Sequence, residues 1–127
     1  DTDDNVRLIE EDHDVITLNG TPAFFKQENS YIPTIKILLE KDIFMPTITV
    51  DMGAVKHVVD GADTMIPGVV GFDTFYEDDI ICVIDVDNQK PLAVGKALMD
   101  SEDLAEQDKG RVVENIHYVG DDIWNLY

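Results

Sequence analysis

Two apolar runs near the start of the chain predict a β-hairpin. Residues 15–18 and 23–25 are mostly apolar, and the dipeptide Asn19-Gly20 lies between them. Asparagine and glycine both accept the positive φ angles of a type I′ turn, so this dipeptide is a strong hairpin signal. We therefore expect two antiparallel strands joined by a tight turn.

A short helix should follow this hairpin. Ile35, Leu38 and Leu39 recur at helical spacing between Pro33 and Lys41. A proline at the start of the segment suits the first turn of a helix, where its missing N–H costs no hydrogen bond. The helix is expected to pack on the hairpin.

Pro46 closes this first unit, because the residue before a proline is disfavoured in a helix. We expect a domain boundary there, with a small α+β domain over residues 1–46 and a second domain over residues 47–127. The chain begins without methionine, so the first domain is expected to be N-terminally incomplete. Asp1–Asn5 is expected to fray and to carry no site.

The second domain begins with a predicted strand over residues 48–50 and a helix from Met52 to Asp60. Asp51 suits the N-cap of that helix and Gly61 its C-terminal stop. Its inward stripe is apolar: Val55, Val58 and Val59. Glycine and proline in residues 62–71 predict a loop with tight turns.

Two apolar stretches, Asp79–Val86 and Pro91–Met99, predict a second hairpin around a polar tetrapeptide. Ser101 can cap a short acidic helix that Gly110 stops, and residues 112–119 predict a final strand. Strands separated by turns, with two short helices, predict a small, mostly β, barrel-like domain.

Charge changes the functional picture. The chain has 9 Lys and Arg against 27 Asp and Glu, a net charge of −18. Both parts are acidic, because four of the basic and ten of the acidic residues precede Pro46. Proteins that bind nucleic acid normally carry a basic surface. Composition alone therefore favours a basic protein partner, or solubility, over nucleic acid.

Other function classes find little support. No run of 18 apolar residues and no secretory pattern occurs, so we expect a cytoplasmic protein with no membrane association. The histidines and Cys82 lack metal-site spacing, so we expect no metal and no cofactor, and Cys82 is expected to be a buried small hydrophobe. The carboxylate pairs Asp78-Asp79 and Asp121-Asp122 are expected to be solvated turn residues. Without a nucleophile elbow or P-loop, no enzyme is expected.

Glycines 61, 68 and 71 are the most informative candidates for a site. They follow a helix and let main-chain N–H groups approach a phosphate or ribose without side-chain obstruction. Lys56 and His57, on the exposed side of that helix, could reach the same ligand. The alternatives are plain turns and a solvated helix face.

A family resemblance adds to this interpretation. The segments "VDMGAVKHVVDGADTMIPGVVGFD", "DDIICVIDVDNQKPLAVGKALM" and "GRVVENIHYVGDDIW" closely resemble the PUA domain, named for pseudouridine synthases and archaeosine transglycosylases. The resemblance covers residues 47–127. Upstream, "VITLNGTPAFFKQENSYIPTIKILLEKDIFMP" resembles the domain that precedes PUA in the malignant T-cell amplified sequence protein and its archaeal relatives.

The resemblance implies an α+β, mostly β fold, a PUA-type pseudo-barrel with two short helices preceded by a small α+β domain. It also implies a stand-alone, non-catalytic factor of the translation machinery that binds structured RNA such as tRNA or rRNA. A translation-factor protein as partner stays open, and no DNA binding is expected.

RNA contact would fall on the helix and the glycine loop. The resemblance transfers it to six residues: Lys56, His57, Gly61, Ala62, Pro67 and Gly68. Lys96 and Arg111 are added as flanking phosphate contacts on charge alone. We further expect Gly68→Val to damage the loop, because glycine there can adopt a positive φ.

Two hypotheses follow for the function. The first is an RNA-binding translation or RNA-processing factor. The second is an acidic protein-interaction module that docks on ribosomal or initiation-factor proteins with little RNA affinity of its own. Clustering of Lys56, Lys96 and Arg111 beside the glycine loop would favour RNA, whereas a continuous acidic coat there would favour a protein partner.

Overall fold

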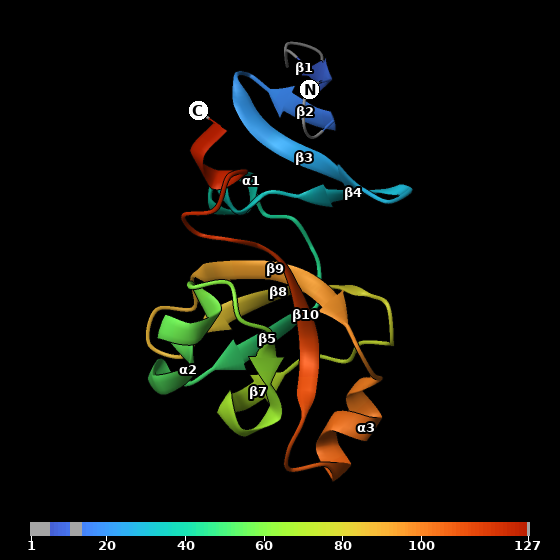
Figure 1. Ribbon diagram of the computed structural model, residues 1–127, viewed down its shortest axis with the longest axis vertical. Coiled ribbons are helices and arrows are strands. Elements are labelled where there is room, and N and C mark those ends of the chain that lie inside the picture. Colours follow the sequence, from blue (N-terminus) through green and yellow to red (C-terminus); the bar gives the residue numbers. More distant parts are fainter. Residues whose placement is uncertain (1–5, 11–13, 127) are drawn as a thin grey trace.

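The computed structural model describes residues 6–10 and 14–126. They form two sheets, a four-stranded sheet near the N-terminus and a six-stranded sheet below it in Figure 1. The prediction that Asp1–Asn5 frays concerns residues outside the described part.

The first unit is an antiparallel sheet in chain order with one helix beneath it. Its elements are β1 (Val6–Glu10), β2 (Asp14–Leu18), β3 (Thr21–Gln27), β4 (Ser30–Pro33) and α1 (Ile35–Glu40). The predicted hairpin is confirmed as β2 and β3, and its turn residues Asn19 and Gly20 have φ angles of 53° and 85°. Strands β1 and β4 were not predicted.

Helix α1 begins later than predicted. Pro33 ends strand β4, where it pairs with Phe24, so its assignment to the first helical turn is wrong. Thr34 is the N-cap, and its hydroxyl oxygen accepts a hydrogen bond of 3.1 Å from the Ile37 N–H. The same hydroxyl donates to the Pro22 carbonyl. Threonine therefore connects the helix start to strand β3.

The four-stranded sheet is apolar on both faces. Val15 and Phe25 are buried on the inner face. On the outer face Leu8, Ile16 and Phe24 pair across β1, β2 and β3, and Leu8 is 50% exposed. Strands that are apolar on both faces appear in sequence as continuous apolar runs rather than as alternation. This explains the runs at residues 15–18 and 23–25.

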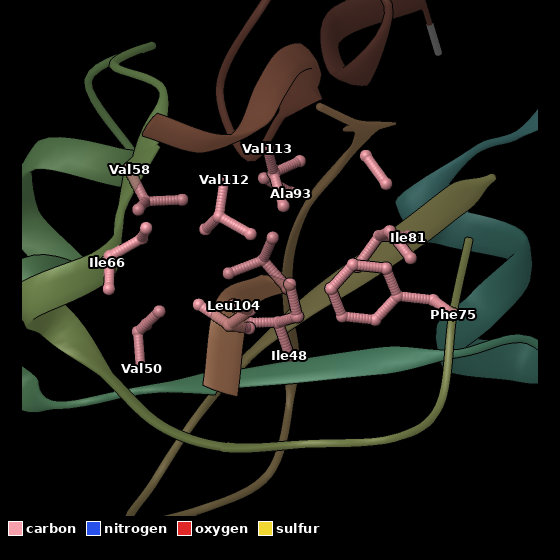
Figure 2. Close-up of a cluster of buried hydrophobic side chains, with 12 residues drawn as sticks. Ile48, Val50, Val58, Ile66, Phe75, Ile81, Ala93, Leu104, Val112 and Val113 are labelled. Atoms are coloured by element: carbon pink, nitrogen blue, oxygen red, sulfur yellow. The ribbon is translucent and has the colours of Figure 1, made fainter. Parts of the chain in front are cut away.

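The second unit is the mostly β domain that the sequence predicts. Its strands are β5 (Thr47–Val50), β6 (Thr64–Met65), β7 (Val69–Phe72), β8 (Ile80–Asp85), β9 (Pro91–Ala97) and β10 (Arg111–Tyr118). Its α-helices are α2 (Met52–Val58) and α3 (Ser101–Glu106), and short 3-10 turns lie at Ile66–Gly68 and Trp124–Leu126. The strand order is β6-β10-β9-β8-β5-β7, antiparallel except for the pair β5–β8. Buried aliphatic side chains and Phe75 fill its interior (Figure 2).

Local signals in this unit were mostly confirmed. Asp51 caps α2, with its carboxylate 2.9 Å from the Ala54 N–H, and Gly61 after the helix has φ +96°. Helix α2 ends two residues early, at Val58. Residues 62–71, predicted as a loop, instead hold β6, a 3-10 turn and β7. Pairing with distant strands, which no local pattern reveals, makes them strands.

The predicted cap of α3 is wrong by one residue. The N-cap position is occupied by Asp100, and Ser101 is the first helical residue. Ser101 is buried, and its Oγ accepts a 3.1 Å hydrogen bond from the Phe75 N–H. Its hydroxyl therefore joins α3 to the loop before β8 rather than starting the helix.

The two units share a second core. Val15, Phe25 and Ile35 of the first unit pack with Val94 of β9 and Ile123 near the C-terminus. The C-terminal turn runs back to α1, as Figure 1 shows in red. The division at residues 46 and 47 stays a prediction, and the last residues of the chain contribute to the first unit's core.

Candidate nucleic-acid interface

A pocket of about 620 Å³ lies beside α2 in the second unit. Small and apolar residues form most of its wall, and polar groups come from Asp51, His57, Asp63 and Arg111. The complete lining is Asp51, Gly53, Ala54, His57, Val58, Ala62, Asp63, Met65, Pro67, Gly68 and Arg111. An apolar pocket with a few polar groups is the usual form of a ligand site.

Gly68 brings the chain close to α2 at this pocket. A Cβ on Gly68 would lie 2.8 Å from the Cβ of Ala54, so no side chain fits without moving one of the two segments. Gly68 does not have a positive φ. The expectation that its conformation requires glycine is therefore wrong, and close packing is the reason instead.

At Gly61, both the backbone conformation and close packing require glycine. Its φ is +96°, and a Cβ there would lie 3.1 Å from the ring carbon Cε1 of Tyr118. The glycine lets the chain leave α2 beneath the tyrosine ring and turn into Ala62 and Asp63.

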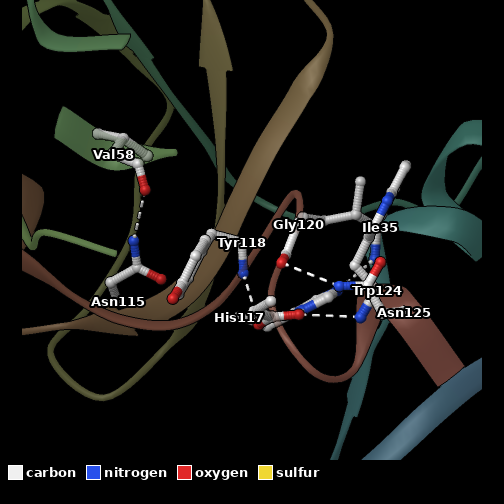
Figure 3. A network of polar contacts seen from close by, with 9 residues as sticks. Ile35, Val58, Asn115, His117, Tyr118, Gly120, Trp124 and Asn125 are labelled. Carbon is white, nitrogen blue, oxygen red and sulfur yellow. Dashed lines mark hydrogen bonds and ion pairs between the residues drawn. The ribbon is translucent and has the colours of Figure 1, made fainter. Parts of the chain in front are cut away.

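Asp63 links the pocket to strand β10. Its Oδ2 accepts a 2.8 Å hydrogen bond from Nη1 of Arg111, and its Oδ1 accepts one of 2.8 Å from the Asn115 N–H. The Asn115 side chain donates to the carbonyl oxygens of Val58, at 3.1 Å (Figure 3), and Ala62, at 3.0 Å. This network joins the end of α2, the loop and β10.

Five of the eight predicted site residues line the pocket: His57, Ala62, Pro67, Gly68 and Arg111. Lys56 is exposed on α2 next to His57, and Gly61 precedes the lining residue Ala62. Lys96 is not part of this group. It lines another pocket of about 250 Å³ with Glu28 and Glu114, and its Nζ is 3.8 Å from Asp78. The clustering of Lys56, Lys96 and Arg111 that would favour RNA is therefore not found.

Comparison with known proteins identifies the family of this chain. The PUA domain profile matches residues 46–119, more than half of the chain. The chain belongs to the PUA domain family. The PUA-type fold inferred from the sequence is thereby confirmed.

Relatives that match most of this chain define a smaller group within the PUA family. The chain is 42% identical to an uncharacterised protein of Methanocaldococcus jannaschii, over 96% of this chain and 76% of that one. It is 33% identical to malignant T-cell-amplified sequence 2 of Homo sapiens, over 97% of this chain and 72% of the human protein. It is 35% identical to translation machinery-associated protein 20 of Saccharomyces cerevisiae, over 87% of this chain but only 65% of the yeast protein.

Solved structures of other proteins show the same fold. A hypothetical protein from Pyrococcus horikoshii superimposes over 99% of this chain and 81% of its own, with TM-score 0.87 and 32% identity. The PUA fold also matches a chain of the archaeal box H/ACA Nop10–Cbf5 ribonucleoprotein complex over 65% of this chain and 27% of that one, with TM-score 0.58 and 25% identity.

Sequence reasoning missed Asp63 and Met65 in the wall of the PUA pocket, and Asn115, which is hydrogen-bonded to Asp63. Asp63 stands directly after two predicted site positions, but its partner Arg111 is 48 residues away. A carboxylate among 27 acidic residues carries no signal of its own. Only the pairing of β6 with β10 brings the two together.

Other kinds of functional site find little support among the described residues. Residues 6–10 and 14–126 contain no group of three His, Cys, Asp or Glu side chains that could hold a metal ion. Cys82 is buried, as expected, and burial raises the pKa of its thiol to about 12, so it stays protonated. No helix among the described residues is long and apolar enough to cross a membrane.

The carboxylate pairs differ from each other. Asp78 is exposed, as expected of a turn residue. Asp121 is not solvated: its carboxylate accepts hydrogen bonds from His117 and from the N–H groups of Tyr118 and Trp124. Burial raises the pKa of Asp121, but these hydrogen bonds outweigh burial and leave the pKa below its ordinary value. The expectation of a solvated residue is wrong for Asp121.

Proposed function

We propose that this protein is a non-catalytic RNA-binding factor of the translation machinery that binds structured RNA through the pocket beside α2. The observation that carries the proposal is the pocket itself, in which Arg111 and His57 stand beside small residues. Pro67 is exposed at the wall of this pocket, and Gly68 packs against Ala54. Such a surface suits recognition of RNA by shape, through ribose and backbone contacts, which needs fewer cations than tracking a phosphate backbone.

The relatives support the translation context. The yeast relative is named for the translation machinery, and neither its name nor that of the human relative is the name of an enzyme. The archaeal ribonucleoprotein with a matching chain supports RNA as the ligand class. We further propose tRNA or rRNA as the RNA, the cytoplasm as the place of action, and a translation-factor protein as a partner.

A binding titration tests the proposal. Fluorescein-labelled tRNA and small-subunit rRNA fragments are titrated with the protein at low and at physiological salt, and anisotropy is recorded. We expect micromolar or tighter binding, weakened about tenfold in Lys56→Ala/His57→Ala, since a hydrogen bond to a charged group contributes roughly that much.

Lys26→Ala is the matched control for this titration. Lys26 is exposed on the other unit, 4.0 Å from Asp14, so its loss removes one cation without touching the pocket. Equal weakening by both variants would mean that charge alone attracts the RNA. No binding of any RNA at low salt would refute the proposed function.

The second candidate is a protein-interaction module, and the net charge of −18 favours it. An acidic surface is attracted to basic ribosomal or initiation proteins over distances set by the ionic strength. If the protein binds ribosomal subunits but none of the isolated RNAs, this candidate replaces the first.

A further inference from the structure

Arg111 is unusual among the nine basic residues because a fixed carboxylate orients it at the pocket. Its Nη1 lies 2.8 Å from Oδ2 of Asp63, and its side chain is still 57% exposed. The guanidinium has five N–H donors in a rigid plane. One hydrogen bond to Asp63 therefore leaves other N–H groups able to donate to a ligand. No second ion pair of Arg111 occurs within residues 6–10 and 14–126.

Asp63 is itself held in place. The side chain is 26% exposed, and its second oxygen, Oδ1, accepts from the Asn115 N–H on strand β10. Asn115 in turn donates to the Val58 and Ala62 carbonyls. The carboxylate cannot rotate without losing a main-chain hydrogen bond, so it gives the Arg111 guanidinium an acceptor in a fixed place.

We propose that Asp63 is a positioning residue that orients Arg111 toward a phosphate group of RNA bound in the pocket. This inference rests on the proposed function. It addresses how a protein with net charge −18 could bind RNA: one arginine held in place needs less ordering on binding than several mobile lysines. On this proposal, the protein recognises RNA through the orientation of the Arg111 N–H groups and not through a basic surface.

The change Asp63→Asn separates positioning from structure. An asparagine keeps one carbonyl oxygen for the Asn115 N–H but loses the charge and the acceptor that hold Arg111. We expect unchanged thermal unfolding and RNA affinity weakened by about tenfold, the effect of one misplaced charge-assisted hydrogen bond. The slope of log Kd against log salt should also fall by about 0.7, the value for one phosphate contact on a single strand.

The background variant Arg111→Gln makes the test specific. If Asp63 acts through Arg111, adding Asp63→Asn to Arg111→Gln weakens binding of the labelled tRNA no further. Asp78→Asn is the matched control, because Asp78 also pairs with a cation, Lys96, but at a different pocket. It removes the same charge and should leave affinity the same or slightly higher.

The outcomes are distinct. Unchanged or tighter binding of tRNA by Asp63→Asn would overturn the positioning role while leaving the proposed function intact, since the carboxylate would then only repel RNA. An equal loss in the Arg111→Gln background would also overturn it, because Asp63 would act independently of Arg111. Absence of RNA binding by the unchanged protein would overturn the proposed function and this inference together.

Discussion

Glycines 68 and 95 occupy positions where another segment of the chain lies too close for a side chain. A Cβ on Gly95 would lie 2.2 Å from the carbonyl oxygen of Glu114, across the paired strands β9 and β10. The contact of Gly68 with Ala54 is the counterpart at the pocket. Both glycines are required by packing between segments distant in sequence, and neither has a positive φ.

Gly68→Ala should therefore destabilise the fold. The added methyl would overlap the Ala54 methyl at 2.8 Å, and overpacking of this kind costs roughly 1–3 kcal/mol. Urea unfolding measures the loss. Gly71→Ala is the control, because the nearest atom to its Cβ is 3.9 Å away.

Compensation identifies the cause of this loss. Ala54→Gly removes the clashing methyl, so Gly68→Ala combined with Ala54→Gly should be less destabilised than the sum of the two single changes. Strict additivity would show that the methyl contact is not the reason for glycine at position 68. Gly68→Val is unsuited to testing RNA binding, because packing and binding would be lost together.

Helix α1 is connected to the second unit through one buried histidine. His117, on β10, is fully buried, and its Nε2 accepts a 3.1 Å hydrogen bond from the Ile35 N–H at the start of α1 (Figure 3). Its Nδ1 therefore carries the proton and donates to Asp121, at 2.8 Å. The ring also packs edge-on against Phe25, with centroids 5.4 Å apart. A single side chain thus joins α1, β3 and the C-terminal segment.

Stability should fall in acid partly because of Asp121. Its pKa is lower in the folded protein than in the unfolded chain, so the carboxylate contributes stability above the unfolded value, near pH 4. That contribution is lost as the pH falls through the folded pKa. Asp121→Asn should lower the free energy of unfolding at pH 7 and make it less dependent on pH below about 4.

Urea unfolding between pH 7 and pH 3 measures this dependence. Asp122→Asn is the matched control, because Asp122 is the exposed neighbour and has the same charge. Identical pH profiles for the two variants would show that the hydrogen bonds of Asp121 contribute nothing to acid stability.

At the scale of the whole molecule, the dominant property is charge. With 27 acidic against 9 basic side chains, repulsion between like charges destabilises the folded state. Two of the ion pairs among the described residues, Lys26–Asp14 and Lys96–Asp78, are partly or fully exposed and 3.8 Å or longer, so such pairs offset little of this repulsion.

Added salt should therefore stabilise the protein. Raising NaCl from about 0.01 M to 0.15 M shortens the screening length from roughly 30 Å to 8 Å, which weakens repulsion in the folded state more than in the expanded chain. The melting temperature should rise over this range. An equal osmolality of sorbitol is the control, and a melting temperature that falls with NaCl would mean that local ion pairs outweigh the net charge.

The sequence by itself determined the features that depend on neighbouring residues. The Asn19-Gly20 turn, the Asp51 cap and the glycine after α2 were predicted correctly because each depends on the φ angles or hydrogen bonds of a few adjacent residues. The ordered family motifs also predicted the PUA fold and the α2 face of the pocket.

The tertiary structure alone decided what depends on pairing between distant segments. Strands β1, β4 and β6 exist because their partners lie beside them, and strand pairing is set by non-local contacts rather than local propensity. The same pairing placed Arg111 against Asp63 and separated Lys96 from both. Packing of α1 against the second unit brought His117 to Ile35, 82 residues away in sequence, because such contacts follow distance in space and leave no periodic trace along the chain.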